Sequence, residues 1–348
     1  MHEIRLPQAV RLLREMVAIP SPSFGENGVS ALLFYFLAEN GIASEAFGCN
    51  LLVRHAPYVA GRKTLMLCAH MDTVEPAEGY TFDPINPPLA DDRVNGLGSN
   101  DDGGSVVSML AAFSHYYGKE LPVNLLLALT AEEERSGPDG MRRLRQALPG
   151  LGIRVDHAIV GEPTGMLAAT SERGLLVLDG VAEGVSGHAA RGEGVNALYL
   201  ALDDIARIRA FPSAQVTQIH AGKAHNVIPD RCTFVVDVRP DGGQSNESVL
   251  AQLQAQCRST LTPRNMANHS SATPADSVLL AIAGALGIPT CASPTTSDWM
   301  HIDCEAIKMG PGDSARSHRA DEYVLISELE DAIDTYKRFI DKYIEIYG

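Results

Sequence analysis

The chain has 348 residues, which is more than one hydrophobic core usually organises, and we therefore expect two domains. Hydrophobic residues make up 45% and charged residues 20% of the sequence, as is ordinary for a soluble globular protein. The formal net charge of −15 disfavours binding to nucleic acid or to anionic membrane surfaces, and no apolar run approaches the roughly 20 residues that span a bilayer.

The N-terminal segment, residues 1–20, has the spacing of an amphipathic helix and lacks the charged-then-apolar order of an export signal. None of the six cysteines belongs to a C-x-x-C pair, and Cys68 lies inside an apolar run, where a small buried side chain is expected. We therefore expect reduced thiols and a cytoplasmic protein.

Three continuous apolar runs, residues 64–69, 123–129 and 157–161, have the length and composition of strands that are covered on both faces. Helical patterns lie between them at 105–117 and 140–148. Strands that alternate with helices predict an α/β fold with a largely parallel sheet and helices on both of its faces.

The pattern changes after about residue 170. Residues 174–185 and 230–240 alternate in part and are rich in β-branched residues, while 196–211 and 246–261 have helical patterns. This mixture predicts a small antiparallel sheet with helices on one face.

The α/β pattern then returns, and the chain closes with a helix over 330–347. We therefore predict one domain made of 1–170 and 284–348, into which a smaller α+β domain, 171–283, is inserted.

Polar groups follow the predicted strands at the edge where ligand sites of α/β sheets form, outside the carboxyl ends of the strands. Taken singly, each has an ordinary explanation: a hydrogen-bonded His-x-Asp pair, a turn or helix cap at Asp-Asp-Gly-Gly, or solvated glutamates in the first turn of a helix. The residues concerned are His70, Asp72, Asp101, Asp102, Glu132, Glu133, Glu134 and Glu162.

Taken together, these groups predict a metal site. Four carboxylates that converge on one cleft repel one another unless cations neutralise them, and two divalent ions would balance the charge. Histidine and carboxylate ligands suit zinc, with cobalt or manganese as possible substitutes. Two such ions that share a bridging carboxylate form a common hydrolytic centre.

Eight motifs in this order resemble the M20 metallopeptidase family, which includes acetylornithine deacetylases, succinyl-diaminopimelate desuccinylases and related amino-acid deacylases and carboxypeptidases. The resemblance covers nearly the whole chain and implies a zinc-peptidase-like catalytic domain with an inserted lid and dimerisation domain. The motifs are HMDT, GSNDDGG, TAEEERSG, VGEPTG, GVSGHAA, NVIPD, VDVRP and GPGDSARSH.

The resemblance assigns the metal ligands. His70 and Glu162 would bind the first of two zinc ions, Glu134 and His318 would bind the second, and Asp101 would bridge them.

The same resemblance assigns the groups around the metals. Asp72 would orient the imidazole of His70, and Glu133 would take a proton from the attacking water and pass it to the leaving amine. Glu132 is expected to be structural, because adjacent residues of an extended chain point in different directions. The chain departs from the family pattern at Gly103, where a lysine is usual.

The inserted domain would supply further groups. His188 matches a histidine that reaches the active site of a partner subunit, although a surface histidine is the simpler explanation. Asn226 and Arg239 match positions that contact substrate, and Arg239 suits a carboxylate. Arg173 and Arg316 would either meet a second substrate carboxylate or pair with nearby acids.

The resemblance thus implies a zinc-dependent amidase that removes an acetyl or succinyl group from an amino acid such as ornithine or citrulline, in arginine biosynthesis. The partners implied are a small N-acyl amino acid and a second copy of the chain in a homodimer. A dipeptidase or carboxypeptidase with the same metal chemistry stays open. So does an inactive binding protein on the same fold, although no ligand or general base is lost.

Overall fold

The structure is a computed structural model that describes residues 3–348, and it divides into two compact units. The first unit runs to Ser171 and also contains Thr273–Ser293 and Ser297–Gly348, whereas the second contains Glu172–Ala272 and Pro294–Thr296. Within the described range no helix is both long and apolar enough to cross a membrane.

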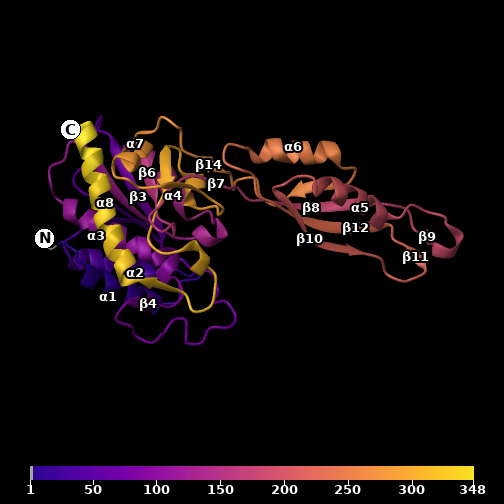
Figure 1. Ribbon diagram of the computed structural model, residues 1–348, viewed down its shortest axis with the longest axis horizontal. Coiled ribbons are helices and arrows are strands. Elements are labelled where there is room, and N and C mark those ends of the chain that lie inside the picture. The colour runs from indigo at the N-terminus through magenta and orange to yellow at the C-terminus, as the bar shows by residue number, and fades with distance from the viewer. Residues whose placement is uncertain (1–2) are drawn as a thin grey trace. The chain divides into compact units, whose positions relative to one another are not determined.

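The first unit is built on a mixed nine-stranded sheet with helices (Figure 1). Its helices are α1 (Leu6–Val17), α2 (Asn27–Glu39), α3 (Gly104–Tyr116), α4 (Met141–Ala147), α7 (Val278–Ala285) and α8 (Ile326–Tyr347). The strands that it contributes are β1 (Ser44–Phe47), β2 (Asn50–Arg54), β3 (Thr64–His70), β5 (Asn124–Thr130), β6 (His157–Val160), β7 (Ala168–Glu172), β15 (Thr290–Ser293) and β16 (Glu305–Lys308). The short strand β14 (Ser271–Ala272), the last in the sheet order, is the end of the main segment of the second unit. A separate two-stranded ribbon is formed by β4 (Arg93–Asn95) and β17 (Tyr323–Leu325).

The strand order is β1-β2-β5-β3-β6-β16-β7-β14, with β15 also paired to β7. The central strands β5, β3, β6 and β16 are parallel, while β1, β2 and β7 join them in antiparallel pairs. The predicted α/β fold is confirmed, and the three apolar runs are β3, β5 and β6, each buried along its whole length.

Alternate residues of each strand point to opposite faces of the sheet, and both faces are covered by helices. Leu65, Leu67 and Ala69 of β3 pack in the core formed with α1, α2, α3, α7 and α8. Met66 and Cys68 pack on the opposite face with α4 and two short helices, η3 (Leu148–Leu151) and η5 (Asp298–His301). Figure 1 shows α8 in yellow beside α3, against which it packs.

The carboxyl ends of the parallel strands lie at one edge of the sheet. His70, the last residue of β3, is in register with Thr130, the last residue of β5. Cys68 of β3 is in register with Val160, the last residue of β6. The segments that follow β3, β5 and β6 therefore start side by side.

The second unit contains an antiparallel sheet of order β10-β12-β8-β13. Buried residues alternate along β8 and β12, and the buried face packs against α5 and α6. A small ladder joins β9 and β11. The elements are β8 (Leu176–Glu183), β9 (Gly187–His188), α5 (Ala197–Ile208), β10 (Ala214–Ala221), β11 (Val227–Ile228), β12 (Arg231–Val238), α6 (Asn246–Gln256) and β13 (Thr260–Pro263).

Two boundaries differ from those expected. The predicted insertion ended at residue 283, but the second unit ends its main segment at Ala272, because Leu279 and Ile282 of α7 pack in the core of the first unit. The helix predicted over 246–261 stops at Gln256, and the chain then turns to form β13.

Candidate metal centre

His70 lies at the carboxyl end of β3 with its side chain almost fully buried. Its Nδ1 atom is 3.1 Å from the carbonyl oxygen of Asp72 and 3.4 Å from Oδ1 of the same residue. The Asp72 carboxylate also accepts hydrogen bonds from the backbone N–H groups of Glu133 and Glu134 and from the Ser23 hydroxyl. Asp72 therefore fixes the imidazole and the glutamate segment relative to each other.

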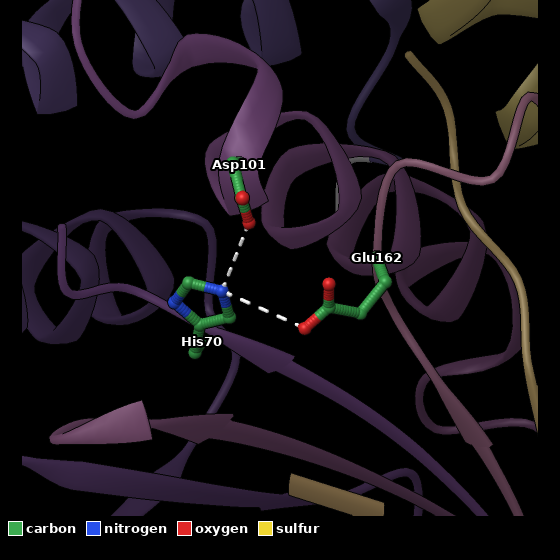
Figure 2. A group of neighbouring side chains, drawn as sticks. All are labelled: His70, Asp101 and Glu162. Carbon is green, nitrogen blue, oxygen red and sulfur yellow. Dashed lines mark hydrogen bonds and ion pairs between the residues drawn. The ribbon is translucent and has the colours of Figure 1, made fainter. Parts of the chain in front are cut away.

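The other nitrogen of His70, Nε2, faces carboxylates (Figure 2). It is 3.2 Å from Oδ1 of Asp101, 3.9 Å from Oε1 of Glu162 and 4.0 Å from Oε2 of Glu133. Glu133 follows β5, Glu162 follows β6, and Asp101 lies in the loop before α3. All three residues are buried. His70, Asp101 and Glu162 place one potential ligand atom each within 4.8 Å of one another.

Asp101 also belongs to a second group. Its Oδ2 atom lies 3.6 Å from Nε2 of His318, which in turn is 3.0 Å from Oε1 of Glu134. Asp101, Glu134 and His318 again place ligand atoms within 4.8 Å of one another. The two oxygens of Asp101 thus face two different histidines, as a bridging carboxylate must.

The loop that carries Asp101 is held by Glu322, a buried residue that the sequence did not single out. Its carboxylate accepts hydrogen bonds from the backbone N–H groups of Gly98, Asn100 and Asp101, at 3.1, 2.9 and 3.0 Å. An acid four residues beyond His318 was the available signal, but nothing local indicates which loop it reaches.

Gly103, where the family pattern has a lysine, lies in a tightly packed turn. A Cβ atom at this position would lie 2.5 Å from the carbonyl oxygen of Gly98 and 2.6 Å from Cδ1 of Leu13. Real Cβ atoms do not approach backbone so closely. The loop of this chain therefore excludes any side chain at Gly103, and the candidate ligands are all present without one.

The three consecutive glutamates point in different directions, but a turn separates them rather than an extended chain. Glu132 adopts a left-handed backbone conformation (φ 59°), and a short 3-10 helix, η2 (Glu133–Arg135), follows. The Glu132 carboxylate accepts the backbone N–H of Asp139, away from the cluster. Because of this turn, Glu133 and Glu134 face the cluster and Glu132 supports the loop.

The protonation behaviour of the site reflects an excess of negative charge. Burial raises the pKa of Glu133 and Glu162 well above the ordinary value, and neighbouring carboxylates add to the effect. Burial opposes a charged His70, but its bonds to Asp101 and Asp72 outweigh burial and raise the pKa of the imidazole well above 6.5. The hydrogen bond with Glu134 raises the pKa of His318 to about 9. Without metal ions, bound protons compensate the negative charge of the carboxylates. Divalent cations suit the same ligand atoms.

The remaining candidate residues lie in the second unit. His188 in β9 pairs with Val227 in β11, and the N–H of Ala189 donates to the carbonyl oxygen of Asn226, so His188 and Asn226 are neighbours. Arg239 lies beyond the other end of β12, where it forms two hydrogen bonds with Asp237. An eight-residue strand spans roughly 25 Å, so Arg239 is far from the other two within one chain.

The two further arginines are already paired. Arg173 donates to Asp241, and Arg316 donates to both carboxylate oxygens of Glu328 at 2.7 and 3.0 Å. Pairing with nearby acids, one of the two expectations from the sequence, thus accounts for both residues.

Known proteins are similar to this chain in sequence and in fold. The chain is 29% identical to the acetylornithine deacetylase of Myxococcus xanthus over 93% of this chain and 94% of that protein. It is 28% identical to the succinyl-diaminopimelate desuccinylase of Xanthomonas campestris pv. campestris (strain B100) over 96% of this chain and 98% of that protein.

Two solved structures have the same fold at low sequence identity. Aminopeptidase PepT from Bacillus cereus ATCC 10987 matches with a TM-score of 0.78 and 17% identity, covering 98% of this chain and 99% of that chain. The Bacillus subtilis YXEP protein, described as a dinuclear metal binding peptidase from the M20 family, matches with a TM-score of 0.76 and 15% identity, covering 98% of each chain.

The sequence pattern of peptidase family M20/M25/M40 extends over residues 66–342. This range begins inside β3, just before His70, and includes both acid–histidine groups and the whole second unit. The hydrolase family that the motifs indicated is thereby confirmed, and the chain belongs to peptidase family M20/M25/M40.

Proposed function

We propose that this protein is a metal-dependent amidase that removes an acetyl or succinyl group from the α-nitrogen of an amino acid such as ornithine or citrulline. The observation that carries the proposal is the convergence of two acid–histidine groups on Asp101. The names of the two sequence relatives support the substrate class, since each describes removal of a small acyl group from an amino acid derivative. A role in arginine biosynthesis in the cytoplasm agrees with the deacetylase relative and belongs to the same proposal.

The donor set is suited to two divalent ions. His70 and Glu162 would hold one, Glu134 and His318 the other, with Asp101 between them. Two imidazoles and three carboxylates favour zinc, and cobalt or manganese can occupy such ligands. When bound, the ions would polarise the acyl carbonyl and make an attacking water more acidic.

Glu133 is the proposed proton carrier. It is buried beside His70, with Oε2 at 4.0 Å from Nε2 of the imidazole, and a carboxylate at this position can hold a proton between two steps. It accepts the proton of the attacking water and returns it to the amine that leaves. Asp72 keeps His70 and the Glu133 backbone in place through the hydrogen bonds described above.

Substrate recognition is assigned to the second unit. Arg239 would bind the α-carboxylate with two hydrogen bonds, in place of Asp237, with which it now pairs. Because Asn226 and His188 are roughly 25 Å from Arg239 in one chain, a small substrate cannot meet all three from that chain. The proposal therefore includes a homodimer in which His188 and Asn226 act on the site of the partner subunit.

A dipeptidase or carboxypeptidase is the second candidate, favoured by the peptidase names of the solved structures that share the fold. These structures are only 15–17% identical to the chain, and such similarity carries the fold rather than the substrate. The deacylase relatives are more similar in sequence and cover nearly the same length.

A substrate panel tests the proposal. Protein loaded with zinc or cobalt is incubated with N-acetyl- and N-succinyl-ornithine and -citrulline, with the α-amides of these compounds and with dipeptides, and the released amine is measured. We expect the N-acyl amino acids to be cleaved fastest, and the Arg239→Ala variant to lose most of the preference over the α-amides. Faster cleavage of dipeptides than of every acyl amino acid would replace the proposal with the peptidase alternative.

A further inference from the structure

Lys308 is a buried lysine next to the candidate metal centre, and it has no part in the proposed reaction. It is the last residue of β16, and its side chain is 1% exposed. It is in register with Val160 of β6, two residues before Glu162, so the ends of the two parallel strands bring the two side chains together. Its Nζ atom lies 4.0 Å from Oε2 of Glu162.

The two oxygens of Glu162 have different neighbours. Oε1 is 3.9 Å from Nε2 of His70, the side of the carboxylate seen in Figure 2, whereas Oε2 faces Lys308. The position of Lys308 on the Oε2 side therefore favours a carboxylate orientation that turns Oε1 toward His70.

The backbone after β16 keeps this contact in place. A Cβ atom at Gly310 would lie 2.6 Å from the carbonyl oxygen of Glu162, so the two segments pack directly against each other. The carbonyl oxygen of Gly310 also accepts the N–H groups of Thr164 and Met166. Lys308 and Glu162 are thus attached to one rigid connection between β6 and β16.

The buried carboxylates around His70 need a compensating positive charge even before metal ions bind. Asp101, Glu133 and Glu162 are buried together, and buried carboxylates repel one another strongly in a medium of low dielectric constant. A buried ammonium group is equally costly unless it is paired with an acid. Each of these two unfavourable burials offsets the other.

We propose that Lys308 is a positioning residue that acts as a built-in counter-ion of the acidic cluster: it holds Oε2 of Glu162 so that the cluster folds, with Oε1 directed at the metal position, before any metal binds. This inference rests on the proposed metal centre for its purpose. The ion pair itself is independent of metal and of catalysis, and the experiment makes use of that independence.

The test is a double-mutant cycle on metal-free protein prepared with a chelator, using Lys308→Met, Glu162→Gln and the double variant. Methionine is unbranched and one atom shorter than lysine, and it removes the charge. We expect Lys308→Met to lower the thermal unfolding midpoint by about 5 °C or more, because one partner of a buried pair is left unpaired. Adding Glu162→Gln to this variant should recover at least half of the loss.

Lys63→Met is the matched control, because it makes the same chemical change at a lysine that pairs with Asp156 but whose own side chain is 45% exposed. Its effect on the midpoint should be small. If the losses from Lys308→Met and Glu162→Gln simply add, the pair does not exist and the inference is wrong. If Lys308→Met gives no folded metal-free protein, recovery of folded protein in the double variant supports the pair, and failure to recover it contradicts the pair.

A second arm separates the counter-ion role from simple packing. Zinc is added to wild type and to Lys308→Met, and the rise in the unfolding midpoint is measured for each. We expect a larger rise for the variant, since the ions then supply the missing positive charge. An equal rise in both would overturn the counter-ion role. Coupling in the metal-free cycle without any zinc binding would preserve the ion pair and refute the metal centre instead.

Discussion

Asp72 and Glu133 lie side by side in the site, and their pKa values shift in opposite directions. Burial would raise the pKa of Asp72, but its bonds to His70 and Ser23 and the N–H of Glu133 hold the pKa below the ordinary value. Burial raises the pKa of Glu133 instead. Asp72 therefore stays ionised where Glu133 takes up a proton more readily, and this contrast agrees with the proton-carrier role proposed for Glu133. At the scale of single residues, this contrast distinguishes Asp72 from Glu133.

The first prediction concerns Glu133→Gln, which keeps the shape of the side chain and removes the proton acceptor. General acid–base groups contribute typically about 10²–10⁴-fold in rate, and we expect kcat/KM to fall by that order. Metal content, measured on the same samples, should stay at the wild-type level.

Glu132→Gln is the control, because Glu132 belongs to the same run but bonds to Asp139 away from the cluster. It should retain near-normal kcat/KM. Near-normal turnover of Glu133→Gln would show that another group carries the proton.

At the scale of elements, the sequence predicted best what is continuous along the chain. The runs that became β3, β5 and β6 are apolar at every position because both sheet faces are covered. β10 was not predicted, since most of its residues are exposed and no alternation marks it.

The same distinction applies to the site. Its polar residues at strand ends were visible because each follows its own apolar run. Glu322 and Lys308 were not, because the groups they contact are distant in sequence and meet them only after folding.

The packing of the second unit depends on a buried acid in α5. Asp204 accepts the backbone N–H groups of Arg258 and Ser259 and the Ser259 hydroxyl. It also pairs with Arg207. These bonds tie α5 to the turn between α6 and β13, and they explain why the helix predicted to continue to residue 261 ends earlier.

The second prediction follows from this acid. Burial alone would raise the pKa of Asp204, but the bonds from Ser259 and Arg258 keep it below the ordinary value. Its stabilisation is therefore fully present above the unfolded pKa of about 3.9 and is lost as the pH falls through the lower folded value.

We expect Asp204→Asn to lower the free energy of unfolding at pH 7 by about 1–3 kcal/mol, because an amide cannot accept all of these bonds. The difference from wild type, measured by urea unfolding, should shrink as the pH falls below about 3.9. A difference that stays constant down to pH 2 would show that the charge of Asp204 is not what stabilises the fold.

At the scale of the whole molecule, the proposed tasks are divided between the two units. The candidate metal ligands and Glu133 all belong to the first unit, and His188, Asn226 and Arg239 belong to the second. Each unit has its own hydrophobic core. Substitutions in one unit should therefore leave the fold of the other intact.

The third prediction uses this division to test action between subunits. His188→Ala and Glu133→Gln should each be nearly inactive. Mixed and allowed to exchange subunits, they should regain part of the activity, because one site of the mixed dimer combines both wild-type groups. No recovery, with subunit exchange demonstrated by a tagged copy, would place His188 in the site of its own chain or outside catalysis.

The measurement that tests the account most directly is the metal content of the reconstituted protein. Protein purified, stripped with a chelator, reloaded with zinc and freed of excess metal should contain two ions per chain by elemental analysis. Asp101→Asn removes the charge of the residue shared by both acid–histidine groups and should lower this number below one. A wild-type protein that binds no zinc, cobalt or manganese would contradict the metal centre and the hydrolase function built on it.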